Sequence, residues 1–144
     1  MKKIILLVFI IGIISSCNND DDTNTNSEVA GSWILTKMSG SIPNSTVTGV
    51  DMEWQETYVL NTNLTFVKTR ERDGVITEVS GTYTVLLPQD TGRILELTFT
   101  NDNNIIGNCS TDLVEHMDFQ SEISFVSSWR ACDGPGLTYE KVNL

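Results

Sequence analysis

Aromatic and charged side chains alternate in the middle of the chain, and they are the residues best suited to chemistry. They are Trp54, Glu56, Tyr58, Phe66, Lys68 and Arg70. Residues at every second position of a β-strand share one face of the sheet. A charged side chain on such an apolar face either pairs with its neighbours or contacts a ligand. Pairing among the charged residues is the default interpretation, and a ligand is the alternative.

The other reactive residues give weak signals. His116 is the single histidine and has no Cys or His at the spacing of a metal site. Serines are plentiful, but the chain has no Gly-x-Ser-x-Gly nucleophile motif. We therefore expect no catalytic residue, no metal, no cofactor and no enzymatic activity.

Composition limits the possible partners. The chain has 144 residues, of which 40% are hydrophobic, so it can form one domain with a real core. Lys and Arg number 9 against 19 Asp and Glu, which gives a net charge of -10. A nucleic-acid partner is not expected, because the basic face that phosphates require is missing.

The N-terminus has the pattern of an export signal. A basic head, Met1 to Lys3, precedes an apolar run over 4–14 and the small residues Ser15 and Ser16. The run is shorter than the roughly 20 residues of a membrane span. The box Ile14-Ser15-Ser16-Cys17 resembles the lipobox of bacterial lipoproteins. That resemblance implies a signal peptide over 1–16 and a lipidated Cys17 that anchors the protein in a membrane; an ordinary secretory signal is the alternative.

The segment 17–28 is predicted to be a disordered, lipid-anchored tether, because its residues are almost all polar or acidic. Its run Asp20 to Asp22 resembles the acidic signals that send some lipoproteins to the cell surface, although a solvated spacer explains it equally well. We expect an outer-membrane protein that faces the periplasm or the cell surface.

The remaining segment, 29–144, has the pattern of an all-β domain. Short runs of Thr, Val, Ile and aromatic residues alternate with polar ones between clusters of Asn, Asp, Gly and Pro. About eight strands are predicted, over 32–38, 52–60, 64–72, 75–87, 93–100, 105–117, 122–131 and 137–142.

Three turns predict how these strands pair. Asp73-Gly74 is typical of a two-residue type I′ hairpin, which pairs Phe66 with Gly81. The turn over 88–92 then pairs Gly81 with Phe99. A three-residue turn over 61–63 places Tyr58 opposite Phe66 and Glu56 opposite Lys68. All three turns direct the apolar residues to one face.

Closure of the sheet is expected because it removes the exposed edges. Gly81 lies where a strand can bend sharply beneath the rings of Phe66 and Phe99. We therefore predict an up-and-down antiparallel β-barrel of about eight strands rather than a sandwich.

Several short motifs resemble a known family. Val29-Ala30-Gly31-Ser32-Trp33 resembles the Gly-x-Trp start of lipocalins, and more closely that of short bacterial lipocalin-like lipoproteins. The segments 63–66, 81–84 and 133–139 also match. The resemblance implies that Trp33 closes one barrel end against a basic residue of the last strand, Lys141 or Arg130.

A ligand pocket is predicted from the composition of the inward face. Its expected lining is aromatic with a few polar groups: Trp54, Glu56, Tyr58, Phe66, Arg70, Tyr83 and Phe99. Arg70 is expected to lie over the Trp54 ring while Glu56 and Lys68 neutralise each other. Arg70 would then be free to bind the acidic head of a small hydrophobic or amphiphilic molecule. The alternative is a structural or protein-interaction module whose barrel is filled by its own side chains, with no partner that the sequence identifies.

A disulfide is predicted between Cys109 and Cys132. They lie at nearly equal distances from a turn near Gln120, as a bond across one hairpin requires, and export permits oxidation. Two free thiols are the alternative.

Overall fold

The computed structural model describes residues 28–90 and 92–142. The predicted signal peptide, Cys17 and all of the tether before residue 28 lie outside this range. The described strands are β1 (Gly31–Ser39), β2 (Val47–Thr48), β3 (Gln55–Leu60), β4 (Thr65–Arg72), β5 (Val75–Leu86), β6 (Ile94–Phe99), β7 (Val114–Ser121), β8 (Ser124–Ser127) and β9 (Gly136–Val142). Two short 3-10 helices lie between strands: Gly49–Asp51 connects β2 to β3, and Ser128–Cys132 connects β8 to β9. No helix in the described range has the length and apolar character of a membrane span.

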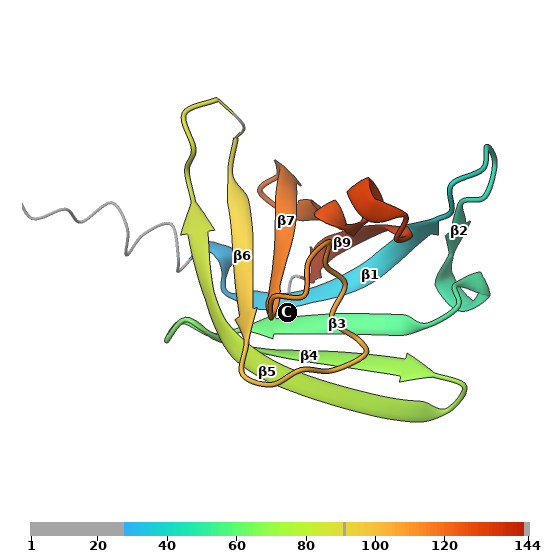
Figure 1. Ribbon diagram of the computed structural model, residues 1–144, viewed down its shortest axis with the longest axis horizontal. Helices are drawn as coiled ribbons and strands as arrows, with labels where there is room; N and C mark the ends of the chain where they lie inside the picture. Colours follow the sequence, from blue (N-terminus) through green and yellow to red (C-terminus); the bar gives the residue numbers. More distant parts are fainter. Residues whose placement is uncertain (1–27, 91, 143–144) are drawn as a thin grey trace, which may run out of the picture.

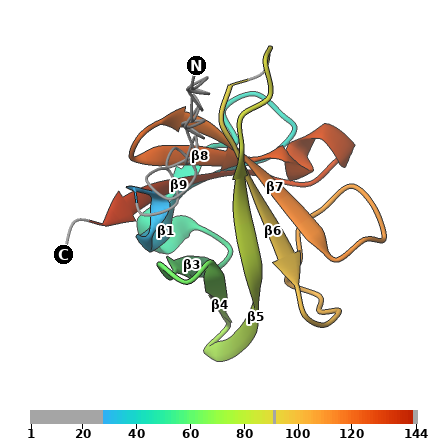
Figure 2. The same ribbon diagram turned by 90° about the vertical axis from the view of Figure 1, so that its left-hand side faces the viewer.

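The strands form a closed antiparallel barrel, as predicted. Eight strands, β1 and β3 to β9, pair in sequence order, and β1 also pairs with β9 to close the sheet. The short β2 pairs only with the end of β1. Figures 1 and 2 show the strands curling around a common interior. No strand crossover is needed, because each strand returns beside the one before it.

The predicted pairing on both sides of β5 is confirmed. Phe66 pairs with Gly81, and Gly81 pairs with Phe99. The β4–β5 turn has positive φ at Asp73 (55°) and Gly74 (76°), as a type I′ turn requires. The Asp73-Gly74 turn therefore predicted the β4–β5 pairing correctly, and the turn over 88–92 predicted the β5–β6 pairing correctly.

The predicted pairing of β3 with β4 is wrong by two residues. Tyr58 pairs with Lys68 rather than with Phe66, and Glu56 pairs with Arg70 rather than with Lys68. The cause is a longer loop, in which Leu64 adopts a left-handed φ of 65° and its N–H donates to the carbonyl of Asn61. A shift of two residues keeps every side chain on its predicted face.

Two predicted strands are shorter than expected. The segment predicted as 105–117 becomes a strand only at Val114, and residues 105–113 belong to the loop before it. The segment predicted as 122–131 is the short strand β8 followed by a 3-10 helix. In both places apolar residues pack over one end of the barrel instead of extending its strands.

Gly81 lies between Phe66 and Phe99 in the sheet, as predicted. A Cβ atom at this position would overlap the carbonyl oxygen of Thr98 and crowd the Phe66 ring. Figure 1 shows β5 bending along its length. Glycine permits this bend because it has no side chain to clash.

Trp33 lies fully buried near the end of the barrel where β1 begins. Its indole N–H donates to the carbonyl of Val29 at 2.9 Å, and the Phe125 ring lies 4.5 Å away between centroids. Of the two basic residues considered, Lys141 makes the contact, with Nζ 5.7 Å from the Trp33 ring centre.

The Cys109–Cys132 disulfide is confirmed, with a Cα–Cα distance of 5.5 Å. It joins the loop before β7 to the 3-10 helix after β8. The bond thus holds together the two chain segments that flank the β7–β8 hairpin, at the end of the barrel opposite to Gly31.

Candidate ligand site at the barrel mouth

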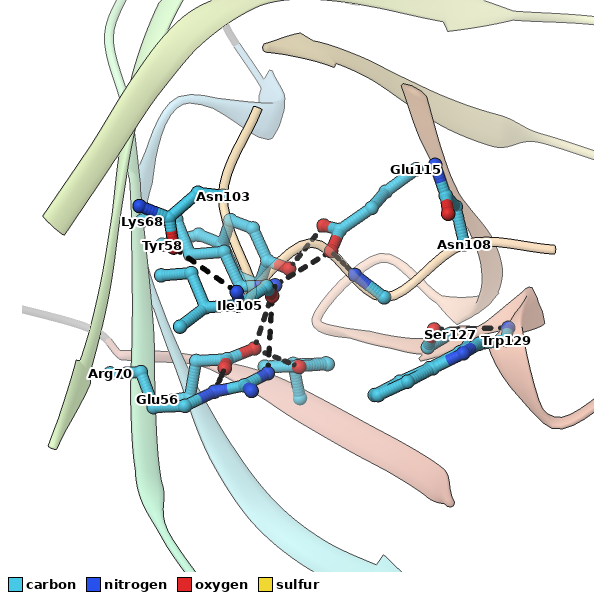
Figure 3. A network of polar contacts seen from close by, with 12 residues as sticks. Glu56, Tyr58, Lys68, Arg70, Asn103, Ile105, Asn108, Glu115, Ser127 and Trp129 are labelled. Carbon is cyan, nitrogen blue, oxygen red and sulfur yellow. Dashed lines mark hydrogen bonds and ion pairs between the residues drawn. The ribbon is translucent and has the colours of Figure 1, made fainter. Parts of the chain in front are cut away.

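The barrel interior holds a compact cluster of charges (Figure 3). Lys68 lies between two carboxylates, with Nζ 3.3 Å from Glu56 and 2.6 Å from Glu115. All three residues are at most 3% exposed. Buried charges are stable only when they are paired and hydrogen-bonded, and the strands bring these three together from β3, β4 and β7.

Two tyrosines complete the hydrogen bonding of the carboxylates. The hydroxyl of Tyr58 donates to Glu115, and the hydroxyl of Tyr139 donates to Glu56, both at 2.6 Å. Burial raises the pKa of each phenol well above its usual value of 10.0, and the neighbouring carboxylates raise it further. Both phenols therefore remain protonated donors to alkaline pH.

The loop before β7 closes over this cluster. The carbonyl of Ile105 accepts from Lys68 Nζ at 2.6 Å and from Arg70 Nη2 at 3.2 Å, and the N–H of Gly107 donates to Glu115. Sequence analysis missed Glu115 and Ile105. The sequence does carry a signal for Glu115: it lies two residues before Met117 on the same strand, so both side chains point to the same, inward face.

Arg70 lies at the edge of the cluster rather than apart from it. Its guanidinium stacks on Trp54 with the central carbon 4.2 Å from the ring centre, which confirms the predicted stacking. The predicted contact of Lys68 with Glu56 is also present. The expectation that Arg70 is left unpaired is wrong, because its Nε donates to Glu56.

The predicted lining residues do share the inward face, and all seven are at most 7% exposed. Several of their rings contact one another, with Phe66 and Phe99 perpendicular at 5.0 Å and Tyr58 and Phe66 at 6.4 Å between centroids. The hydroxyl of Tyr83 donates to the carbonyl of Asn61 at 2.7 Å, and burial raises the pKa of this phenol. These side chains fill the interior around the charge cluster.

A pocket of about 250 Å³ opens at the barrel mouth, which is the end away from Gly31. It is lined by Arg70, Arg72, Asp73, Val75, Thr77, Asn104 and Ile105. Of the predicted ligand residues, Arg70 alone belongs to this lining. The β4–β5 hairpin provides one wall and the loop before β7 the other.

The indole of Trp54 lies beside the two arginines of this pocket. The guanidinium of Arg72 lies 5.8 Å from its ring centre, so both arginines lie near the same indole. In the described part of the chain, the indole N–H of Trp54 is the single buried side-chain polar group without a hydrogen-bond partner. The mouth thus combines two arginines, each paired with a glutamate, with Asp73 and the apolar side chains of Val75 and Ile105.

A metal centre has no support in the described ranges, where no group of three or more His, Cys, Asp or Glu side chains has a suitable arrangement. The chain matches none of the family models, curated proteins or solved structures with which it was compared. The lipocalin-like resemblance therefore stays a prediction from the sequence motifs.

Proposed function

We propose that this protein is a non-enzymatic, exported lipoprotein whose lipocalin-like barrel binds a small amphiphilic carboxylate at its mouth. In this proposal a lipidated Cys17 anchors it in the outer membrane, facing the periplasm or the cell surface. The observation that carries the binding proposal is the mouth pocket, with the largely buried guanidinium of Arg70 in its lining. The interior is not the proposed site, because aromatic rings and paired charges occupy it.

The chemistry of the pocket favours a carboxylate with a short apolar body. Guanidinium groups bind carboxylates through paired N–H donors. Arg72 donates to Glu53 through Nη2 but keeps half of its side chain exposed, and a solvent-exposed pair of this kind is weak enough for a ligand to displace. Val75 and Ile105 offer apolar contact. The net charge of -10 repels anions at long range, but salt screens it beyond about 8 to 10 Å.

The pocket volume limits the ligand. About 250 Å³ is at or below the low end of small-molecule sites, which hold roughly 300 to 1,000 Å³. A short-chain acid fits this volume, whereas most of a long fatty acid would extend into solvent.

Titration with hexanoate, followed by Trp fluorescence and calorimetry, tests the binding proposal. We expect Arg72→Gln to weaken binding by about tenfold or more, because a charge-assisted hydrogen bond contributes about 1.5 to 3 kcal/mol. Arg93→Gln is the matched control, since Arg93 lies over Phe119 at the opposite end. Equal affinity in the wild type and Arg72→Gln would refute the proposed site.

The second candidate function is a protein-interaction module with a filled barrel. The observation that favours it is the packed interior, where Glu56, Lys68 and Glu115 are bonded to one another. Such a module would show no saturable change in Trp fluorescence with any short-chain acid.

A further inference from the structure

Strand β5 has an open edge beside the mouth pocket. β5 pairs with β4 along Val75 to Thr82, but its pairing with β6 begins only at Gly81. The hairpin therefore extends past β6, as Figure 1 shows at the end of β5 next to the β4–β5 turn. Within the described ranges, no strand pairs with the β6-facing side of Val75 to Val79.

Two residues direct their backbone groups to this open edge. In an antiparallel strand, successive residues direct their N–H and C=O groups to opposite sides. The carbonyl of Ser80 accepts from the N–H of Thr100 on the β6 side. Ile76 and Glu78 have the same parity, so their N–H and C=O groups also face that side. Both residues are exposed, and Ile76 is 70% exposed.

The pocket lies on the inward face of the same edge. Val75 and Thr77 belong to both β5 and the pocket lining, together with Arg70 and Arg72 from β4. A strand added along β5 would therefore direct every second side chain into the pocket. Added strands gain affinity from backbone hydrogen bonds and specificity from pockets for alternate side chains.

Charge defines the chemistry of such a strand. Its inward side chain would meet Arg70 and Arg72, whose guanidinium groups favour an acidic residue, with Asp73 as the single acidic residue among the described residues that line the pocket. Its outward side chains would lie beside Glu78, which favours basic residues. A second copy of this chain fits poorly, because each copy carries a net charge of -10 and would bring another Glu78 to the edge.

We infer that the carboxylate recognised at the mouth belongs to an extended peptide, which adds to the β5 edge with an acidic side chain in the pocket and basic residues on either side. This inference rests on the proposed function of the pocket, and it specifies that the bound carboxylate is a side chain of a peptide. The peptide would hydrogen-bond to the backbone of Ile76 and Glu78 and place its carboxylate near Arg70 and Arg72.

The test uses the purified full chain and a labelled peptide, acetyl-Val-Lys-Glu-Lys-Val-amide, followed by fluorescence anisotropy. Replacing the peptide Glu with Gln should weaken binding by about tenfold, the effect of losing one charge-assisted pair. Methylating the peptide nitrogens that face β5 should weaken it by a similar factor, whereas methylating the alternate nitrogens should change it less than about threefold.

Protein variants check the same edge. Ile76→Pro removes the outward N–H, and proline is accepted where that group faces solvent. Ile76→Ala, which loses side-chain atoms but keeps the N–H, is the control. We expect Ile76→Pro to bind the peptide at least about fivefold more weakly than Ile76→Ala.

The outcomes separate the two proposals. Binding of hexanoate without binding of any peptide overturns the peptide inference and leaves the pocket proposal standing. Equal effects of the two methylation patterns, or a dimer of the chain that Ile76→Pro dissociates, would also overturn the inference. Failure of both hexanoate and peptides to bind overturns both proposals.

Discussion

The hydroxyl of Tyr139 lies 2.6 Å from Oε1 of Glu56 and joins the last strand of the barrel to β3 across 83 residues of sequence. β1 stands between these two strands in the sheet, so the bond spans the interior rather than following the ladder. The bond of Tyr58 to Glu115 spans the barrel in the same way, from β3 to β7. Polar side chains therefore connect strands that do not pair.

This arrangement predicts instability at high pH. Burial, followed by the nearby carboxylates, raises the pKa values of Tyr58 and Tyr139 well above 10.0 in the folded protein. In the unfolded chain the same phenols ionise near pH 10. The stabilisation that the two buried, protonated tyrosines give the folded protein is therefore fully present below pH 10 and is lost as the pH rises above 10. Phenolate absorbance at 295 nm should rise together with unfolding, and not before it. A rise near pH 10 in protein that is still folded by circular dichroism would contradict this prediction.

Replacement of Lys68 by Met should strongly destabilise the barrel. The variant leaves Glu56 and Glu115 buried without their shared cation, and removing one partner of a buried ion pair costs about 3 to 5 kcal/mol. Urea unfolding measures this loss. Lys37→Met is the matched control, since Lys37 is exposed and its replacement should change the free energy of unfolding by less than about 0.5 kcal/mol. Equal effects of the two variants would argue against the network's role in stability.

Reduction of the disulfide should lower stability by about 3 kcal/mol, because Cys109 and Cys132 close a loop with a sequence separation of 23. Both cysteines are exposed, so a thiol reductant reaches the bond in the folded protein. The urea midpoint of the wild type should fall when dithiothreitol is added. The urea midpoint of the double variant Cys109→Ser, Cys132→Ser should not change with dithiothreitol. If the midpoint of the wild type also stays constant, the disulfide does not stabilise the fold.

Replacement of Cys17 by Ala should move the protein from the membrane fraction to the soluble fraction. The lipobox resemblance around Ser15, Ser16 and Cys17 motivates this prediction. Intact-mass spectrometry of the wild type should show a mature chain that begins at Cys17 and carries acyl chains. Membrane retention of the variant at unchanged mass would contradict lipidation.

The sequence predicted the pairing of strands wherever a turn has a distinctive chemistry. Asp73-Gly74 fixes the β4–β5 pairing because both positions require positive φ. The predicted β3–β4 turn is wrong because Leu64, a residue type that rarely adopts positive φ, does so here. Nothing in the residue type of Leu64 marks that conformation, which occurs together with the hydrogen bond from its N–H to the carbonyl of Asn61.

The site was predicted only in part, because its second wall comes from a loop. Alternation along β3 and β4 correctly placed Trp54, Glu56 and Arg70 on the inward face. The apolar side chain of Ile105 predicts a strand position, yet the residue lies in a loop, where its carbonyl accepts from Lys68 and Arg70. Backbone groups carry no sequence signal, so the pairing of Arg70 and the position of the pocket required the three-dimensional structure.

The pairing of β1 with β9 also brings the two ends of the described fold together. Ser32 and Val142 are direct neighbours in the ladder, so a short linker can join the two ends of the described fold without moving a strand. New ends placed in the exposed β5–β6 loop would leave every ladder intact. The fold is thus compatible with circular permutation, and a permuted chain would build the same barrel from a different starting strand.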